Sequence, residues 1–291
     1  MSRTESAYVA GRFIAMADAT VSASDAGLLL GAGLFETLRT YGGRPFRLGT
    51  HLARLRASGE TLRIFVEETD ERVAEIVARL VDENGVPGAR VRITATRGPL
   101  GAALDDDASP PATLLVTAGP MTPYPAELYE RGTTVVVSDI RVNETDPTVY
   151  HKTTGYLANL LALRDAHRAR AAEAVRFNSK GRLAEGAISN VFIVSGGRLI
   201  TPPVEEGLLA GVTRAAVLEV ASEAGVAAEQ RPVAAGEFLH ADEVFLTNSI
   251  MEILPVGRIE ATEVGDGRPG PVTKRLAEAY RALVARETGV A

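Results

Sequence analysis

The chain has 291 residues, of which 46% are hydrophobic and 23% charged, a balance typical of a soluble folded protein. Its 31 basic and 37 acidic residues give a net charge of −6, so we expect neither a nucleic-acid partner nor binding to an anionic membrane. There is no cysteine, which excludes disulfides, thiolate metal sites and a cysteine nucleophile. The four histidines show no metal-ligand spacing, so no metal is expected. No long apolar run is present, and we predict a cytoplasmic protein.

The first half of the chain alternates between strand and helix patterns. Hairpin signals occur at Ala10-Gly11-Arg12 and at Gly42-Gly43. Apolar residues at helical spacing predict helices over 51–62 and 71–81, and alternating β-branched residues predict strands over 91–96 and 114–117. Together these elements predict a small α+β domain over residues 1–117.

Residues 118–125 hold three prolines, which predicts an interdomain linker because proline is excluded from helix interiors and central strands. A larger domain is predicted over 126–291. Its strands are expected at 133–137, 174–178, 182–184, 191–194 and 243–246, and its helices directly after residue 156, at 212–224 and at 272–286. The whole chain therefore reads as a two-domain α+β protein.

Lys152 is the first candidate for chemistry. It precedes the amphipathic run 157–163, so we predict that it lies at the mouth of a helix. An amine beside apolar surface can lose its proton and form a Schiff base. Tyr156 is predicted to lie one helical turn away, facing the same pocket. The alternatives are a solvated lysine and an ordinary core tyrosine.

Several other residues could complete a cofactor site. Glu185, at the end of a predicted strand, could pair with a ring nitrogen and favour its protonated form, or it could be an exposed turn residue. Gly211-Val212-Thr213 opens a predicted helix whose free N–H groups could bind phosphate. The turn Thr247-Asn248-Ser249 and the guanidinium of Arg54 could add further donors.

Two further segments do not indicate a functional site. Gly31-Ala32-Gly33 resembles the start of a dinucleotide fingerprint, but it lacks the third glycine and a strand pattern follows it. The acid run Asp105-Asp106-Asp107 predicts a solvated loop.

In this order, the segments resemble the class IV aminotransferase family, which includes branched-chain aminotransferases, D-amino-acid aminotransferases and aminodeoxychorismate lyase. The resemblance covers about residues 25–256. Its motifs are Gly33-Leu34-Phe35-Glu36-Thr37, His51-Leu52-Ala53-Arg54-Leu55, Thr96-Arg97-Gly98, Lys152 to Tyr156, Glu185 to Val191, Leu209-Ala210-Gly211-Val212-Thr213 and Thr247 to Val256.

The resemblance implies two α+β domains, pyridoxal 5'-phosphate in the cleft between them, and a homodimer. Lys152 would be the catalytic Schiff-base lysine and Glu185 the partner of the pyridine nitrogen. The remaining cofactor contacts implied by the family are Tyr156 on the ring oxygen, Leu209 on the ring face, and Arg54, Val212, Thr213 and Ser249 on the phosphate.

The substrate signals are mixed. Family members specific for branched-chain amino acids usually have a tyrosine five residues after the lysine, whereas here it is four. The Arg-x-His pair that well-known D-amino-acid members use to bind the substrate carboxylate is absent after Gly98. Arg90 and Arg92 alternate on one predicted strand and therefore share a face, so one or both could bind the carboxylate instead. Phe35 and Ile250 are also expected to contact substrate.

We therefore predict a transaminase that acts on an amino acid and a 2-oxo acid, favouring D-amino acids. Aminodeoxychorismate lyase is the first alternative, and a branched-chain L-amino-acid aminotransferase is the second. A protein that binds pyridoxal phosphate without turnover is a further alternative from a different class.

Overall fold

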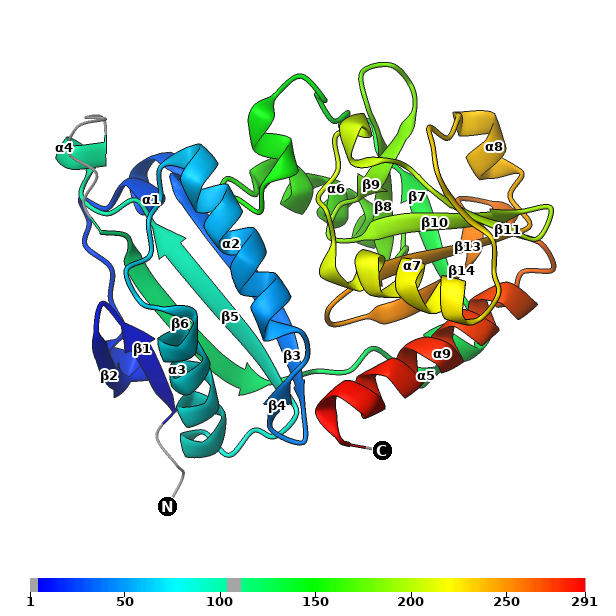
Figure 1. The fold of residues 1–291 in the computed structure, drawn as a ribbon. Helices are drawn as coiled ribbons and strands as arrows, with labels where there is room; N and C mark the ends of the chain where they lie inside the picture. Colours follow the sequence, from blue (N-terminus) through cyan, green and yellow to red (C-terminus); the bar gives the residue numbers. More distant parts are fainter. Residues whose placement is uncertain (1–4, 104–110, 291) are drawn as a thin grey trace. The chain divides into compact units, whose positions relative to one another are not determined.

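The computed structural model describes residues 5–103 and 111–290, which form two compact units (Figure 1). The first unit comprises the described residues up to Thr122, the segment His151–Gly155 and the residues from Glu287 onward. The second comprises Pro123–Tyr150 and Tyr156–Arg286. The predicted acid loop at Asp105–Asp107 lies outside the described residues.

The first unit is built on a six-stranded sheet with the order β2-β1-β6-β5-β3-β4, in which every pairing is antiparallel. Both predicted hairpins are present, with turns at Ala10-Gly11 and Gly42-Gly43. The strands are β1 (Ser6–Val9), β2 (Arg12–Ala15), β3 (Gly33–Tyr41), β4 (Arg44–Pro45), β5 (Ala89–Thr96) and β6 (Thr113–Pro120).

Helices α2 (Leu48–Leu62) and α3 (Asp70–Glu83) pack on one face of this sheet (Figure 1). Their apolar stripes and alternate residues of β3, β5 and β6 form one buried core, as expected for amphipathic helices covering a sheet. Thr69 caps α3 by accepting a hydrogen bond from the N–H of Arg72. Shorter helices are η1 (Met16–Asp18), α1 (Ala26–Leu30) and α4 (Leu100–Ala103).

The predicted linker begins inside a strand. β6 continues through Ala118 and Gly119 to Pro120, all three in register with β5. Proline is tolerated there because it is the last residue of the strand, where few ladder hydrogen bonds remain to be lost. The segment around Lys152 also belongs to the first unit rather than to the second.

The second unit is built on a mixed nine-stranded sheet with the order β12-β11-β10-β13-β14-β7-β8-β9 and β15 beside β14. β7 runs parallel to both β14 and β8, and most other pairs are antiparallel. The strands are β7 (Thr133–Val137), β8 (Glu173–Phe177), β9 (Leu183–Gly186), β10 (Asn190–Ser195), β11 (Arg198–Thr201), β12 (Ala228–Gln230), β13 (Glu243–Asn248), β14 (Glu252–Ile259) and β15 (Thr262–Glu263).

Helices cover this sheet, with α6 contacting β8, α7 contacting β13 and α5 contacting β14. Glu243 accepts hydrogen bonds from the first N–H groups of the last helix, at Val272 and Thr273. The helices are α5 (Ala126–Arg131), η2 (Pro147–Tyr150), α6 (Leu157–Arg168), η3 (Val204–Glu206), α7 (Val212–Glu223), α8 (Ala235–Leu239) and α9 (Pro271–Thr288). Helices and sheets in both units confirm the predicted α+β class. Over the described residues, no helix is long and apolar enough to cross a membrane.

Candidate active site

The segment that carries Lys152 is extended, not helical. The carbonyl of Lys152 accepts a hydrogen bond from the N–H of Phe35 at 2.8 Å, and Thr153 forms a bridge with Leu34. Helix α6 begins only at Leu157. The prediction that Lys152 lies at the mouth of a helix is therefore wrong, because pairing with β3 competes successfully for its backbone.

Gly33 makes room for this segment. A Cβ atom there would lie 2.8 Å from Thr154 Oγ1 and 3.1 Å from the carbonyl oxygen of Ala95, so a side chain would push the segment away. The strand expected after Gly33 is β3, in agreement with the rejection of a dinucleotide fingerprint. The absence of a side chain at Gly33 thus allows close approach of the lysine segment to the sheet.

Lys152 Nζ lies over the ring of Phe35, 4.5 Å from its centroid. The guanidinium of Arg92 lies over the same ring at 3.6 Å. Both cations thus gather at one aromatic side chain, as cation–π attraction favours. Arg90 shares the strand face of Arg92 as predicted, but its side chain is exposed whereas Arg92 is half-buried. The two strand arginines therefore differ, because Arg92 lies over Phe35 beside Lys152 and Arg90 is exposed.

Arg54 lies on α2, the helix that packs against β3. Its Nε and Nη2 donate to the two carboxylate oxygens of Glu36 at 2.8 and 2.6 Å. His51 Nδ1 lies 2.7 Å from Glu36 Oε2. Burial opposes the charge of Glu36, but Arg54 and His51 outweigh it and lower the pKa of Glu36 to about 2. Burial lowers the pKa of His51, so at neutral pH this is a neutral histidine beside an ion pair.

In the second unit, Glu185 occupies β9 with its side chain only 13% exposed, so it is not an exposed turn residue. One carboxylate oxygen accepts from Arg176 Nη2 at 2.8 Å, and the other from the N–H of Leu209 at 3.1 Å. Sequence reasoning missed Arg176. It lies directly opposite Glu185 in the β8–β9 ladder, a cross-strand pairing that knowledge of the register would have revealed.

A second buried carboxylate, Glu173, fixes the turn that follows Glu185. It accepts four hydrogen bonds, from the N–H groups of Ala174, Ala187 and Ile188 and from the hydroxyl of Ser189. The turn is so tight that a Cβ atom at Gly186 would lie 2.2 Å from Ser189 Oγ. Sequence reasoning missed Glu173, because nothing local marks it as a partner of residues 14 to 16 positions away.

Tyr156 precedes α6 and donates its hydroxyl to the carbonyl of Ala187 at 3.1 Å; Asn159 donates to the same carbonyl at 2.7 Å. The prediction that Tyr156 lies one helical turn from Lys152 is wrong, because residues 152–155 are not helical. Tyr156 instead contacts the turn that follows Glu185.

Two backbone segments carry the predicted phosphate donors. Helix α7 begins at Val212, and its N-cap Gly211 provides no side-chain hydrogen bond to the first turn. Leu209, just before it, is held by Asn190, whose amide donates to the carbonyl of Leu209 at 2.9 Å. At the end of β13, Asn248 Oδ1 accepts from the N–H groups of Ile250 and Met251 at 2.8 Å each. Ser249 and Ile250 therefore lie in an ordered turn.

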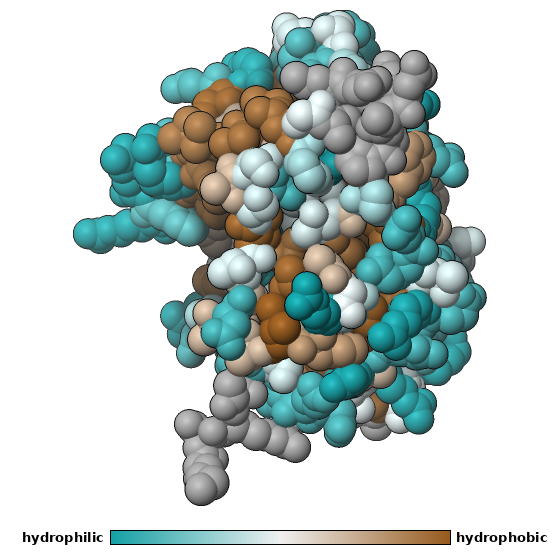
Figure 2. All heavy atoms as spheres, turned by 90° about the vertical axis from the view of Figure 1, so that its left-hand side faces the viewer, coloured by the Kyte–Doolittle hydropathy of each residue, from teal (hydrophilic) through white to brown (hydrophobic). Residues whose placement is uncertain are grey.

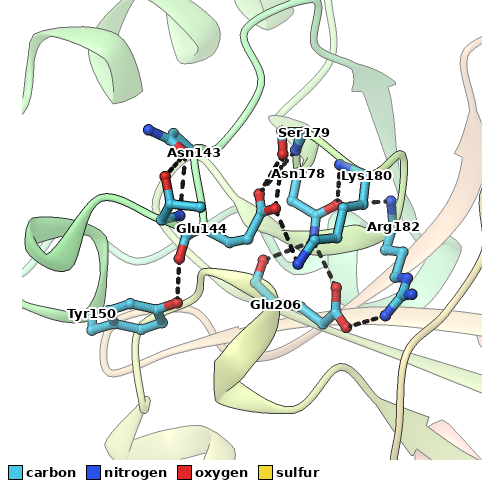
Figure 3. Close-up of polar contacts among 9 residues, drawn as sticks. Asn143, Glu144, Tyr150, Asn178, Ser179, Lys180, Arg182 and Glu206 are labelled. Atoms are coloured by element: carbon cyan, nitrogen blue, oxygen red, sulfur yellow. Dashed lines mark hydrogen bonds and ion pairs between the residues drawn. The ribbon is translucent and has the colours of Figure 1, made fainter.

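A separate polar network is structural (Figure 3). Glu144 accepts from both the N–H and the hydroxyl of Ser179. Glu206 accepts from Asn178 at 2.6 Å and from Arg182 at 2.9 Å. The network fastens two loops to the turn between β8 and β9, and it contains none of the predicted site residues.

These groups fit pyridoxal 5'-phosphate by their chemistry. The first unit offers the amine of Lys152, which suits the aldehyde of the cofactor, and the guanidinium of Arg54, which suits its phosphate. The second unit offers the N–H groups at the start of α7, which also suit the phosphate, and the arginine-paired carboxylate of Glu185, which suits the ring nitrogen. Over residues 5–103 and 111–290, no group of three or more histidine, aspartate or glutamate side chains is placed to hold a metal ion.

Glu173 predicts a pH dependence of stability. Burial is the main cause that raises its pKa from 4.5 to about 7. The folded state therefore binds more protons than the unfolded state between these values, and the unfolding free energy falls as pH rises through this window. Glu173→Gln cannot titrate, so its stability deficit relative to wild type should shrink by up to about 3 kcal/mol between pH 4.5 and pH 7.5. Urea denaturation of the wild type and of Glu173→Gln across this pH range measures the change in the deficit. A deficit that stays constant with pH would contradict the raised pKa of Glu173.

The fold and these side chains define a two-domain α+β enzyme of the pyridoxal-phosphate type. Comparison with known proteins gives the family: residues 33–259 match Amino-transferase class IV. The chain belongs to this family and is a pyridoxal-phosphate-dependent aminotransferase.

Individual relatives cover nearly the whole chain. It is 35% identical to a protein assigned as a branched-chain-amino-acid aminotransferase in Methanocaldococcus jannaschii, over 94% of each chain. It is 30% identical to the D-alanine aminotransferase of Listeria monocytogenes, over 94% of this chain and 93% of that one. The solved branched-chain amino acid aminotransferase of Escherichia coli superposes with a TM-score of 0.92 at 30% identity, covering 98% of this chain and 96% of that one.

Proposed function

We propose that the enzyme exchanges an amino group between an α-amino acid and a 2-oxo acid in two half-reactions, with D-amino acids as preferred donors. The observation that carries the proposal is the grouping of Lys152 and Arg92 at the ring of Phe35, at 4.5 and 3.6 Å from its centroid. An α-amino acid presents an amino group and a carboxylate one carbon apart. The amine of Lys152 is suited to the chemistry at the amino group, and the nearby guanidinium of Arg92 is suited to binding the carboxylate.

In this proposal each residue has a defined task. Pyridoxal phosphate, when bound, supplies a carbonyl for amino groups and a ring that withdraws electrons. Lys152 Nζ is the attachment point and then the base that removes the proton from the substrate Cα. Glu185, kept in place by Arg176 and the N–H of Leu209, holds the proton of the ring nitrogen.

The other predicted contacts serve binding and orientation. Arg54, the N-terminal N–H groups of α7 at Val212 and Thr213, and Ser249 are proposed to hold the phosphate. Leu209 packs on the ring and Tyr156 contacts its oxygen. Phe35 and Ile250 border the substrate. The pairing of Leu209 with Glu185 and Asn190 supports a fixed ring face.

D-amino acids are proposed because Arg92 offers a strand-borne guanidinium in place of the arginine-containing pair of the family's D-amino-acid members. The main rival is a branched-chain L-amino-acid aminotransferase, which is favoured by the 35% identity to the M. jannaschii protein. A half-reaction scan separates them: each amino acid is added alone and conversion of the bound cofactor to its amine form is read by absorbance. The proposal expects D-alanine to react at least about tenfold faster than L-leucine; the reverse order would establish the rival.

Arg92→Ala tests the carboxylate contact within the same scan. Losing a charge-assisted hydrogen bond to the carboxylate should raise KM for the amino acid about 10- to 100-fold. Arg90→Ala is the matched control, because Arg90 is on the same strand face but exposed, and its KM should stay within about twofold of wild type. Equal effects of the two substitutions would contradict the assignment to Arg92.

The lyase alternative has its own readout. Release of pyruvate from aminodeoxychorismate without an added 2-oxo acid, together with no response to any amino acid in the scan, would replace transamination by elimination. The same scan covers binding without turnover: no change of the cofactor spectrum with D-alanine, L-leucine or (R)-1-phenylethylamine would support that alternative.

We also propose a homodimer. Helix α1 exposes three consecutive leucines, Leu28, Leu29 and Leu30, at 65%, 51% and 61%. Figure 2 views the side of the molecule that is on the left in Figure 1, where α1 lies, and apolar residues reach the surface in the upper part of this view. A contiguous apolar patch of this kind is typical of a protein–protein interface. Light scattering should give twice the chain mass for wild type and a smaller mass for Leu29→Glu.

A further inference from the structure

The carboxylate of Glu36 lies within hydrogen-bond distance of the Arg54 guanidinium. Along β3, alternate residues Leu34, Glu36 and Leu38 face the core beneath α2. Glu36 is only 1% exposed there, a costly position for a carboxylate unless it is paired. Its partners come from α2, where Arg54 and His51 lie three residues apart and therefore on one helix face.

The contact between Glu36 and Arg54 fixes the plane of the guanidinium. Two parallel hydrogen bonds, at 2.8 and 2.6 Å, join Arg54 Nε and Nη2 to the two oxygens of Glu36. A bidentate arginine–carboxylate pair of this kind is directional, because both groups are planar. Arg54 keeps some contact with solvent, with its side chain 15% exposed, whereas Glu36 is enclosed.

His51 fixes the carboxylate in turn. An ionised carboxylate accepts hydrogen bonds only, so His51 Nδ1 must carry the proton in its 2.7 Å contact with Glu36 Oε2. The low pKa of Glu36 agrees with an ionised group. The chain of contacts runs from a fully buried histidine, through a fully buried carboxylate, to an arginine at the surface of the unit.

We infer that Glu36, held by His51, is a positioning residue that orients the Arg54 guanidinium for the phosphate of the cofactor. This inference rests on the proposed function, in which Arg54 binds that phosphate. It assigns Glu36 and His51 to cofactor affinity rather than to the chemistry at Lys152. It also explains why a charged residue occupies an inward position of β3 among leucines.

The test compares pyridoxal 5'-phosphate with pyridoxal, which lacks the phosphate. Both are titrated into cofactor-free full-length protein. The ratio of the dissociation constant of pyridoxal to that of pyridoxal 5'-phosphate reports how much the phosphate contributes to binding. Glu36→Gln keeps the size of the side chain but places an amide NH₂ group, itself a donor, against the N–H donors of Arg54 and His51. Its ratio should fall about tenfold or more from wild type, while pyridoxal alone binds within about twofold.

Glu243→Gln is the matched control, because Glu243 is also a buried, hydrogen-bonded carboxylate but caps α9. Its ratio should equal that of wild type. Arg54→Lys should lower the ratio as Glu36→Gln does, and the double variant should fall little further. If Glu36→Gln does not fold, Glu36→Asp, with the charge retained but the reach shortened, should give an intermediate ratio.

Three outcomes overturn the inference and are distinguishable. A wild-type ratio in Glu36→Gln, or in Glu36→Asp where only that variant folds, overturns the positioning role alone if wild-type Lys152 still takes up the cofactor. If neither compound attaches to Lys152 in wild type, the proposed function falls as well. Unequal ratios of Arg54→Lys and Glu36→Gln with additive effects in the double variant would also show that the two residues act separately.

Discussion

Replacing Lys152 with alanine is expected to lower the rate of amino transfer by at least about 10⁴-fold, because in the proposed function Lys152 supplies both the amine that attaches the cofactor and the base that moves the Cα proton. The fold should persist, since the backbone contacts of residue 152 with Phe35 do not need the side chain. Single-turnover conversion of the cofactor, followed by absorbance with the preferred amino acid, measures the loss.

Lys274→Ala is the matched control for Lys152→Ala. Lys274 lies exposed on α9, and its loss should change the rate less than about twofold. Added methylamine should restore part of the activity of Lys152→Ala, because a free amine can take over the proton transfer. A Lys152→Ala protein with a rate within tenfold of wild type would show that the amine acts elsewhere.

Replacing Glu185 with glutamine is expected to lower the same rate by about 10²- to 10³-fold. In the proposed function Glu185 holds the proton of the ring nitrogen, which a neutral amide cannot do, so the charge that develops at the substrate Cα would be less well stabilised. Arg176 loses its anionic partner at the same time, which adds a cost to stability. The rate with saturating amino acid and the absorption maximum of the bound cofactor should both change.

The control for Glu185→Gln is Glu206→Gln in the network of Figure 3. Glu206 is also buried and paired with an arginine, Arg182, so its loss carries a similar cost to stability. Its effect on the rate should stay below about tenfold, with no change of the cofactor spectrum. If both variants lost activity equally and in step with their unfolding free energies, Glu185 would be a structural residue only.

The sequence predicted most elements of both units because their patterns are local. The alternation in 91–96 and 133–137 and the helical spacing in 51–62 and 212–224 each identify an element that the structure contains within a few residues. The small helices α1 and α8 and the strand β12 escaped prediction, because segments of three to five residues have no resolvable period. The longer strand β14 also escaped prediction, since Pro255 within it argues against a central strand.

The chemistry was harder to predict where it depends on pairing between distant segments. A lysine followed by an apolar run reads as a helix start, yet the segment around Lys152 pairs with β3, more than 110 positions earlier in the chain. Arg176 and Glu173 could not be identified, because their roles follow from the β8–β9 register and from one tight turn. Motif resemblance found Arg54 but not Glu36 as its partner, since a motif names residues and not their contacts.

Trapping the cofactor tests the central claim most directly. The protein loaded with pyridoxal 5'-phosphate is reduced with borohydride, digested and analysed by mass spectrometry. We predict one pyridoxyl group per chain, on Lys152, and none after the amine form of the cofactor has been produced with the preferred amino acid. A label on another lysine, or no label on a protein that still binds the cofactor, would contradict it.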